Sequence, residues 1–332
     1  MKWTDKDIKV LEAWTKSDDQ DRNKICKKLG RKWHPINCKI NLLGMDTPQN
    51  KKDKYVQKEI DKTKDEEIQR LHKQIKELNR HKNIVAHKFF DKVVRIGVVT
   101  DTHMGSMYHR KDVLDVAYDT FEREGIKQVY HAGDLCDGEK VYRGQEYEIF
   151  AHGADAQVKE VVKNYPKKKG IKTYFITGNH DLSFYVTAGT DIGDRIAAKR
   201  PDMVYLGKDI ADVIIGSEKN AVRMRLVHPG GGSAYALSYA PQKYIEALAG
   251  GQKPEIIIFG HYHKAEMLPC YRNTFAIQGG TCQSQTPFMT RRKIAAHLGF
   301  WILEFTIDKP YLISRFKAEF FAIYEERDAL QL

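Results

Sequence analysis

The stretch Val98-Val99-Thr100-Asp101-Thr102-His103 decides how this chain is interpreted. Residues 93–100 are almost continuously apolar or β-branched, which is typical of a strand buried on both faces. Residues i and i+2 of an extended segment lie on the same side, so we expect Asp101 and His103 to converge on one metal ion. An isolated Asp-x-His pair more often belongs to a surface turn. The interpretation therefore depends on the residues at the ends of the later strands.

The same arrangement, an apolar run that ends in polar side chains, recurs four times. The run at 127–132 leads into His131-Ala132-Gly133-Asp134-Leu135-Cys136-Asp137, that at 171–177 into Gly178-Asn179-His180-Asp181, that at 221–227 into His228, and that at 255–259 into Gly260-His261-Tyr262-His263. Sites in α/β sheets are built from such strand ends. Each motif alone has a plain alternative, a capped turn or a loop histidine. Agreement among all five predicts one shared metal site.

The order of the apolar runs indicates an α/β fold. Strands are expected at 93–100, 127–132, 171–177, 212–216, 221–227, 255–259, 274–278 and 299–307, and helices at 112–124 and 146–164. Strands and helices alternate in the first half, whereas strands come one after another in the second. This pattern predicts layered sheets with helices on the outside.

Five motifs between residues 101 and 263 resemble those of the calcineurin-like metallophosphoesterases: Asp-x-His, Gly-Asp-x-x-Asp, Gly-Asn-His-Asp, a lone His and Gly-His-x-His. The resemblance implies a double β-sheet sandwich flanked by helices, with a two-metal centre. It implies that Asp101, His103 and His263 hold one ion, that Asn179, His228 and His261 hold the other, and that Asp134 bridges them. It also implies that His180 is the acid that protonates the leaving oxygen and that Asp137 orients it. Asp181 is expected to hydrogen-bond the loop.

Two cations ~3.5–4 Å apart can lower the pKa of a shared water and hold both oxygens of an in-line displacement at phosphorus. Mixed His, Asp and Asn ligands suit Mn²⁺, Fe or Zn²⁺ better than Ca²⁺ or Mg²⁺. We therefore expect two divalent transition-metal ions, with manganese as the first choice.

One position departs from the protein phosphatases of this superfamily. They place an arginine directly after the second Asp of Gly-Asp-x-x-Asp, where this chain has Gly138. Lys140 or Arg143 could replace it, but the change lowers the case for a protein phosphatase. The stretches 228–265 and 279–287 are similar to the DNA-processing branch, namely the nuclease subunit of double-strand-break repair complexes and the small subunit of archaeal D-family DNA polymerases. We therefore expect a phosphodiesterase or nuclease acting on DNA.

The N-terminal part carries most of the positive charge. The chain has a net charge of +11, and residues 1–92 hold 24 basic against 15 acidic side chains. Such an excess is typical of a nucleic-acid-binding appendage, although a merely soluble lysine-rich surface is the alternative.

Helical spacing predicts three short helices within residues 1–45. The first runs from Asp5 to Thr15 after a Thr4 cap, the second from Asp21 to the stop at Gly30, and the third comes after His34-Pro35. The order resembles a Myb-like helix-turn-helix, although Asp21-Arg22-Asn23 stands where such repeats have a second core tryptophan. The resemblance implies a third helix that reads DNA, and a protein-interaction module is the alternative. The expected DNA contacts are Arg31, Lys32, Asn37, Lys39 and Asn41.

The sequence predicts three domains: 1–45 as the helix-turn-helix, 46–88 as a charged linker with a long helix at 59–85, and 89–332 as the phosphoesterase. Heptad spacing in the long helix covers only two heptads, so packing on its own catalytic domain is favoured over a homodimer. Five cysteines without a C-x-x-C pair indicate a reducing compartment. No apolar run approaches the ~18 residues that a membrane span needs, so we expect a soluble, cytoplasmic protein.

Two other functions stay open. The first is hydrolysis of a small phosphoester or nucleotide, with the basic arm used only for localisation. The second is a non-catalytic DNA-bound scaffold, which the complete set of Asp101, His103, Asp134, Asn179, His180, His228, His261 and His263 argues against.

Overall fold

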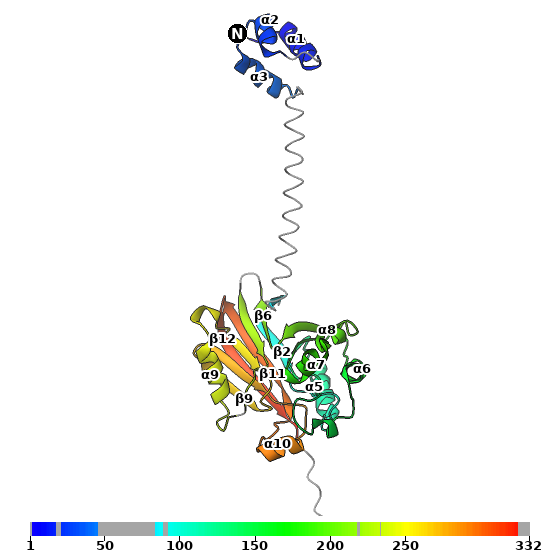
Figure 1. The fold of residues 1–332 in the computed structure, drawn as a ribbon. Coiled ribbons are helices and arrows are strands. Elements are labelled where there is room, and N and C mark those ends of the chain that lie inside the picture. Colours follow the sequence, from blue (N-terminus) through cyan, green and yellow to red (C-terminus); the bar gives the residue numbers. More distant parts are fainter. Residues whose placement is uncertain are drawn as a thin grey trace, which may run out of the picture. The chain divides into compact units, whose positions relative to one another are not determined.

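The computed structural model describes residues 2–17, 21–45, 84–88, 92–217, 220–232 and 234–324. The chain divides into two compact units, residues 1–77 and 78–332 (Figure 1).

The first unit contains three helices, α1(Asp5–Thr15), α2(Arg22–Leu29) and α3(Trp33–Leu42). Thr4 forms a capping box with Asp7 at the start of α1, and left-handed Gly30 ends α2. The buried core is aliphatic and consists of Leu11, Ile25, Ile36 and Ile40. The helix bounds agree with the prediction, except that α3 begins two residues before Pro35. Pro35 therefore lies in the first turn of α3, where the N–H group that proline lacks would have no partner in the helix anyway. A helix-turn-helix that binds DNA stays a prediction.

The second unit contains two six-stranded sheets. The strand order in the first is β1(Ile84–Lys88), β6(Ile210–Gly216), β7(Ala221–Val227), β8(Ile256–Phe259), β10(Thr274–Gly279) and β9(Ala265–Tyr271). The order in the second is β12(Leu312–Ala322), β11(Gly299–Lys309), β2(Val93–Val99), β3(Gln128–Ala132), β4(Lys172–Thr177) and β5(Met203–Lys208). Strands β2 to β5 are parallel, as are β7, β8 and β10, so their carboxyl ends gather at one edge of each sheet.

The two sheets pack face to face over a hydrophobic core. Strand β2 shows the reason, because its alternate residues Val94, Ile96 and Val98 point into this core while Val99 joins the cluster on the opposite face. That opposite face is covered by α5(Lys111–Arg123), α6(Ala154–Asn164) and α8(Ile192–Ala197), and α9(Tyr239–Ala247) covers the other sheet (Figure 1). Helices thus flank a double sheet, which confirms the predicted α/β sandwich of the second unit.

All eight predicted strands and the helix at 112–124 are present, with bounds shifted by a few residues at most. The helix expected at 146–164 is wrong in its first half: the short η1(Gln145–Tyr147) leads into an irregular stretch, and α6 starts only at Ala154. The N–H groups of Phe150 and Ala151 donate to the carbonyl of Gly105 instead of continuing a helix.

The start of the second unit also differs from the prediction. Most of the helix expected at 59–85 lies outside the described residues, but Ile84 and Val85 belong to strand β1. Strand β1 pairs in parallel with β6, which supplies it with hydrogen-bond partners along one edge. Residues 84–88, placed in the linker by the sequence, are therefore part of the first sheet.

No helix among the described residues is both long and apolar enough to cross a membrane. The five cysteines are all unpaired, and Cys136 and Cys282 are buried.

Candidate metal centre

Five strand ends supply the side chains of the candidate site. Asp101 and His103 come after β2, Asp134 after β3, Asn179 and His180 open α7(Asn179–Ala188) after β4, His228 comes after β7, and His261 and His263 after β8. These strand ends belong to both sheets, so the site lies where the two carboxyl edges meet. The structure therefore brings the predicted site residues together at strand ends.

The conformation of these segments differs from the extended one assumed from the sequence. Five of the site residues have a left-handed backbone with φ between 46° and 77°, namely Asp101, His103, Asp134, His261 and His263. The side chains converge because the chain turns sharply at each residue, so strand alternation is the wrong reason for a correct grouping.

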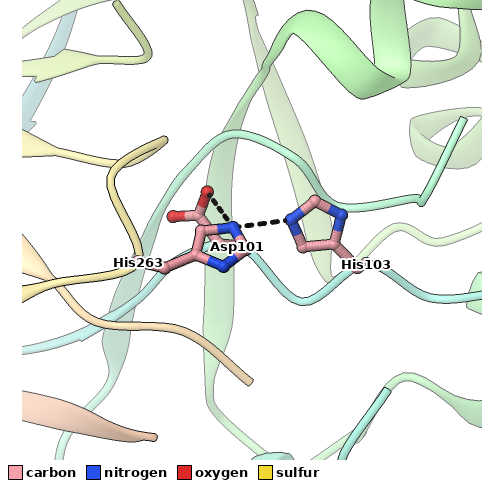
Figure 2. A group of neighbouring side chains, drawn as sticks. All are labelled: Asp101, His103 and His263. Carbon is pink, nitrogen blue, oxygen red and sulfur yellow. Dashed lines mark hydrogen bonds and ion pairs between the residues drawn. The ribbon is translucent and has the colours of Figure 1, made fainter. Parts of the chain in front are cut away.

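The first cluster consists of Asp101, His103 and His263, which lie close together in Figure 2. One ligand atom from each lies within 4.8 Å of the other two. The Nε2 atoms of His103 and His263 are 3.0 Å apart, and His263 Nε2 is 3.5 Å from Asp101 Oδ1 (Figure 2). All three side chains are buried or nearly so, and an inward-facing carboxylate with two imidazoles is a donor set that suits a divalent transition metal.

The second cluster consists of Asp134, His228 and His261, again with ligand atoms within 4.8 Å of one another. Asn179 joins it through Oδ1, which lies 3.1 Å from His228 Nε2 and 2.9 Å from His261 Nδ1. Asp134 Oδ2 lies 3.1 Å from His228 Nε2 and 3.9 Å from His103 Nε2. Asp134 therefore touches both clusters, as a bridging carboxylate must.

The electrostatics of the site keep both aspartates ionised. Burial raises the pKa of Asp134, but His228 and His180 outweigh it and hold that pKa well below its usual range. The pKa of Asp101 is lowered in the same way, against its burial, by His263 and His228. Burial lowers the pKa of His228. The charge of Asp134 acts in the opposite direction, and the net result is a pKa raised to about 10. Two buried, ionised carboxylates ringed by imidazoles offer the negative charge that a pair of metal ions would neutralise.

Asp137 contacts two histidines of the site through different atoms. Its carboxylate lies 3.1 Å from His103 Nδ1 and also accepts from Gln145 and Gln283, both at 3.1 Å. Its contact with His180 is made by the backbone carbonyl, 2.5 Å from Nδ1, whereas the carboxylate is 4.0 Å away. The side chain thus orients the candidate ligand His103, and the backbone orients His180.

His180 lies in the first turn of α7 and not in an extended segment. Its Nδ1 faces the carbonyl of Asp137, which leaves Nε2 toward the cavity that the residue lines. Burial lowers the pKa of His180, but the charges of Asp134 and Asp137 raise it above its ordinary value. The ring also lies within 4.8 Å of ligand atoms of His103 and Asp134, so its position suits either an acid or a ligand.

Asp181 holds two of the site loops together. Its carboxylate accepts from the N–H groups of Leu135 and Gly178 at one oxygen and of Cys136 at the other, at 2.8–3.0 Å. The expectation that Asp181 hydrogen-bonds the loop is confirmed.

Above the two clusters lies a cavity of about 470 Å³. Besides the site residues, it is lined by side chains that the sequence motifs did not indicate: Val141, Tyr142, Tyr262, Thr286, Phe288, Met289, Arg292 and Ile294. Neither Lys140 nor Arg143 lines the cavity. It is instead lined by the positively charged side chain of Arg292. No motif spacing points to Arg292, because it lies beyond the last ligand on α10(Pro287–Arg292).

The backbone at Gly138 leaves no room for the arginine that the protein phosphatases have at this position. Its φ is +67°, and a Cβ at this position would collide with the carbonyl oxygen of His180. A side chain at 138 would therefore displace the first turn of α7.

The residues predicted to bind DNA lie in the first unit. Arg31 packs its guanidinium on the Trp3 ring, 4.3 Å from the centroid, and lies 3.5 Å from Asp7. Lys32 precedes α3, and Asn37, Lys39 and Asn41 lie on that helix. Their binding to DNA stays a prediction.

Comparison with known proteins gives one family match. Residues 94–291 match the model of the calcineurin-like phosphoesterase superfamily domain. No curated protein matches the sequence.

Several solved structures have a similar fold but low sequence identity. Vacuolar protein sorting 29 from Cryptosporidium parvum is 15% identical, covering 71% of this chain and 100% of its own, with a TM-score of 0.38. The Escherichia coli phosphoesterase Yfce is 14% identical, with coverages of 68% and 98% and a TM-score of 0.33. GAP50 of Plasmodium, an anchor in the inner membrane complex, is 11% identical, with coverages of 69% and 84% and a TM-score of 0.41. The family model, and not these structures, carries the assignment.

Proposed function

This chain belongs to the calcineurin-like phosphoesterase superfamily, and on that premise we propose that it is a two-metal phosphodiesterase. One observation carries the proposal: Asp134 belongs to one ligand cluster and lies 3.9 Å from His103 of the other, beneath a cavity of about 470 Å³. A single structural ion would need only one closed cluster, whereas two clusters joined by a carboxylate suit displacement at phosphorus.

The residues divide into two ligand sets and a proton donor. Asp101, His103 and His263 would hold one ion, Asn179, His228 and His261 the other, and Asp134 both. When bound, the ions supply positive charge for the phosphoryl oxygens and favour ionisation of the attacking water. Manganese is our first choice for both ions, with iron or zinc as alternatives.

His180 would donate a proton to the leaving oxygen. The carbonyl of Asp137 fixes its Nδ1, so the proton for the leaving oxygen would come from Nε2. The charges of Asp134 and Asp137 raise its pKa above the ordinary value, which favours the protonated ring that an acid needs. Asp137 supports the site mainly by orienting His103.

DNA is the proposed substrate of this diesterase. The absence of a phosphate-gripping side chain at Gly138 and the basic charge of residues 1–92 support it. A small nucleotide or phosphoester is the second candidate, and the size of the cavity favours it. A non-catalytic scaffold is disfavoured because both ligand clusters are complete.

The test is a metal-dependent assay of the full chain. Protein stripped with a chelator would be reloaded with Mn²⁺, Fe²⁺, Zn²⁺ or Mg²⁺ and assayed on bis-p-nitrophenyl phosphate and on single- and double-stranded DNA. We expect hydrolysis of the chromogenic diester only after reloading, and its loss in Asp134→Asn. Reloaded protein that folds normally but hydrolyses none of these substrates would refute the proposal, and hydrolysis of the small diester without DNA would leave the second candidate.

A further inference from the structure

Two aromatic side chains form one wall of the cavity beside the metal clusters. Tyr142, from the loop after Asp137, stacks on Phe288 of α10 with ring centroids 4.3 Å apart and an interplanar angle of 20°. Both rings are only partly buried, and both line the cavity.

The wall is held in place from both sides. The Tyr142 hydroxyl donates to Glu148 at 2.8 Å, and Thr286 caps α10 by accepting from the N–H of Met289 at 3.2 Å. Met289 is buried beneath the helix. The aromatic pair is therefore in place before any ligand arrives, which lowers the entropy cost of binding beside it.

The wall stands beside the proposed proton donor. The ring centroids of Tyr142 and His180 are 6.3 Å apart, in an edge-to-face arrangement. A phosphoryl group at the metal clusters would therefore have the aromatic surface within reach of one of its ester groups.

Positive charge lies at the same wall. The guanidinium carbon of Arg292 is 5.8 Å from the Phe288 ring centroid, and Arg292 lines the cavity, whereas its neighbour Arg291 does not. An aromatic wall next to a cation matches a group that combines an aromatic ring with a phosphate.

We infer that Tyr142 and Phe288 form a subsite for a nucleobase, with Arg292 contacting the phosphate attached to it. The inference rests on the proposed function, since it places that phosphate at the metal clusters. The cavity volume of about 470 Å³ accommodates one nucleotide-sized group and not a stretch of paired strands. The substrate is thus a nucleotide unit that is not base-paired, either a free nucleotide ester or the unpaired end of a strand.

Binding measurements test the subsite without relying on turnover. Mn²⁺-loaded full chain would be titrated calorimetrically with thymidine 5′-monophosphate and with methyl phosphate. We expect the nucleotide to bind at least about 10-fold more tightly, because base–aromatic stacking supplies the difference. Phe288→Leu should abolish this preference and leave methyl phosphate binding unchanged, whereas Phe288→Tyr, which keeps the ring, should retain it.

Matched variants control for general effects. Phe150→Leu removes an aromatic ring that is 52% exposed and lies outside the cavity lining, and it should change nothing. Arg292→Gln should weaken binding of both phosphates several-fold, and Arg291→Gln should not. A short single-stranded oligonucleotide that binds more tightly than the mononucleotide identifies a strand end as the source of the base, and equal affinities identify a free nucleotide.

Failure of the subsite and failure of the proposed function give different results. Equal affinity of wild-type protein for the nucleotide and methyl phosphate, or an unchanged preference in Phe288→Leu, would overturn the subsite alone. Absence of metal-dependent hydrolysis of bis-p-nitrophenyl phosphate would overturn the proposed function, on which the subsite rests.

Discussion

Replacing His180 by asparagine should separate proton donation from metal binding. The imidazole Nδ1 lies 2.5 Å from the carbonyl of Asp137, and an asparagine amide can also donate to that carbonyl. The local backbone should therefore keep its shape, including the bond from the His180 N–H to Asp134 Oδ1 at 2.9 Å. What the variant loses is the acidic Nε2–H at the cavity.

The size of the effect depends on the leaving group. A general acid contributes about 10²–10⁴-fold when the departing oxygen is a poor leaving group such as a sugar alkoxide. The raised pKa of His180 favours the protonated ring from which this proton would come. A p-nitrophenolate hardly needs a proton, and its departure should slow only a few-fold. The ratio of the two activities should therefore change by about 100-fold or more.

The assay compares kcat/KM on bis-p-nitrophenyl phosphate and on a single-stranded oligonucleotide, with metal content measured by elemental analysis. His152→Asn is the matched control, because its side chain is 60% exposed and does not line the cavity. Equal losses on both substrates would show that His180 is not the leaving-group acid. Loss of about one metal ion per chain would instead identify His180 as a ligand, as its place beside His103 and Asp134 also allows.

Further changes probe other parts of the molecule. His261→Ala should bind about one metal ion fewer per folded chain by elemental analysis, since a missing ligand is poorly compensated, and an unchanged metal content would contradict the ligand set. Deleting residues 1–44 should leave hydrolysis of the small diester intact but weaken DNA binding, with the log–log salt slope falling by about 0.9 per lost phosphate contact; identical affinity and slope would point to an interaction module. Gly138→Ala should lower the free energy of unfolding in urea by at least about 2 kcal/mol, because it combines a left-handed backbone with a Cβ against a carbonyl oxygen. Burial, aided by the charge of Lys172, lowers the pKa of His87 to about 4. The folded protein should therefore lose stability as the pH falls from 6.5 toward 4, by roughly 1–2 kcal/mol at pH 5 after allowing for partial screening. The variant His87→Gln should lack this part of the pH dependence of thermal unfolding.

The sequence predicted those parts of the fold in which one physical signal dominates. Strand β2 and the other central strands are apolar runs bounded by polar turns, and all were found. Strand β12 was missed because its residues are exposed or only partly buried along their length, so no apolar run exists to detect. Strand β9 contains Pro269, which argues against a strand until its position at the edge of the sheet is known.

The site was predictable as a set of residues but not as a set of contacts. Motif order was enough to bring Asp134 together with ligands from four other strand ends. It did not show that Asp137 would use its carbonyl for one histidine and its carboxylate for another, since both atoms belong to the same residue. Nor did it indicate Phe288 or Arg292, which reach the cavity only through the path of the chain after β10.

The left-handed backbone of the ligand residues has a consequence for how such a chain can change over time. A non-glycine residue in this conformation costs roughly 1–2 kcal/mol, and five of them together approach the whole stability of an ordinary domain. Glycine at any of these positions would relieve the strain at the price of one ligand. A lineage that stopped using the metals would therefore gain stability with each such replacement, and mutational drift would erase the centre rather than preserve it.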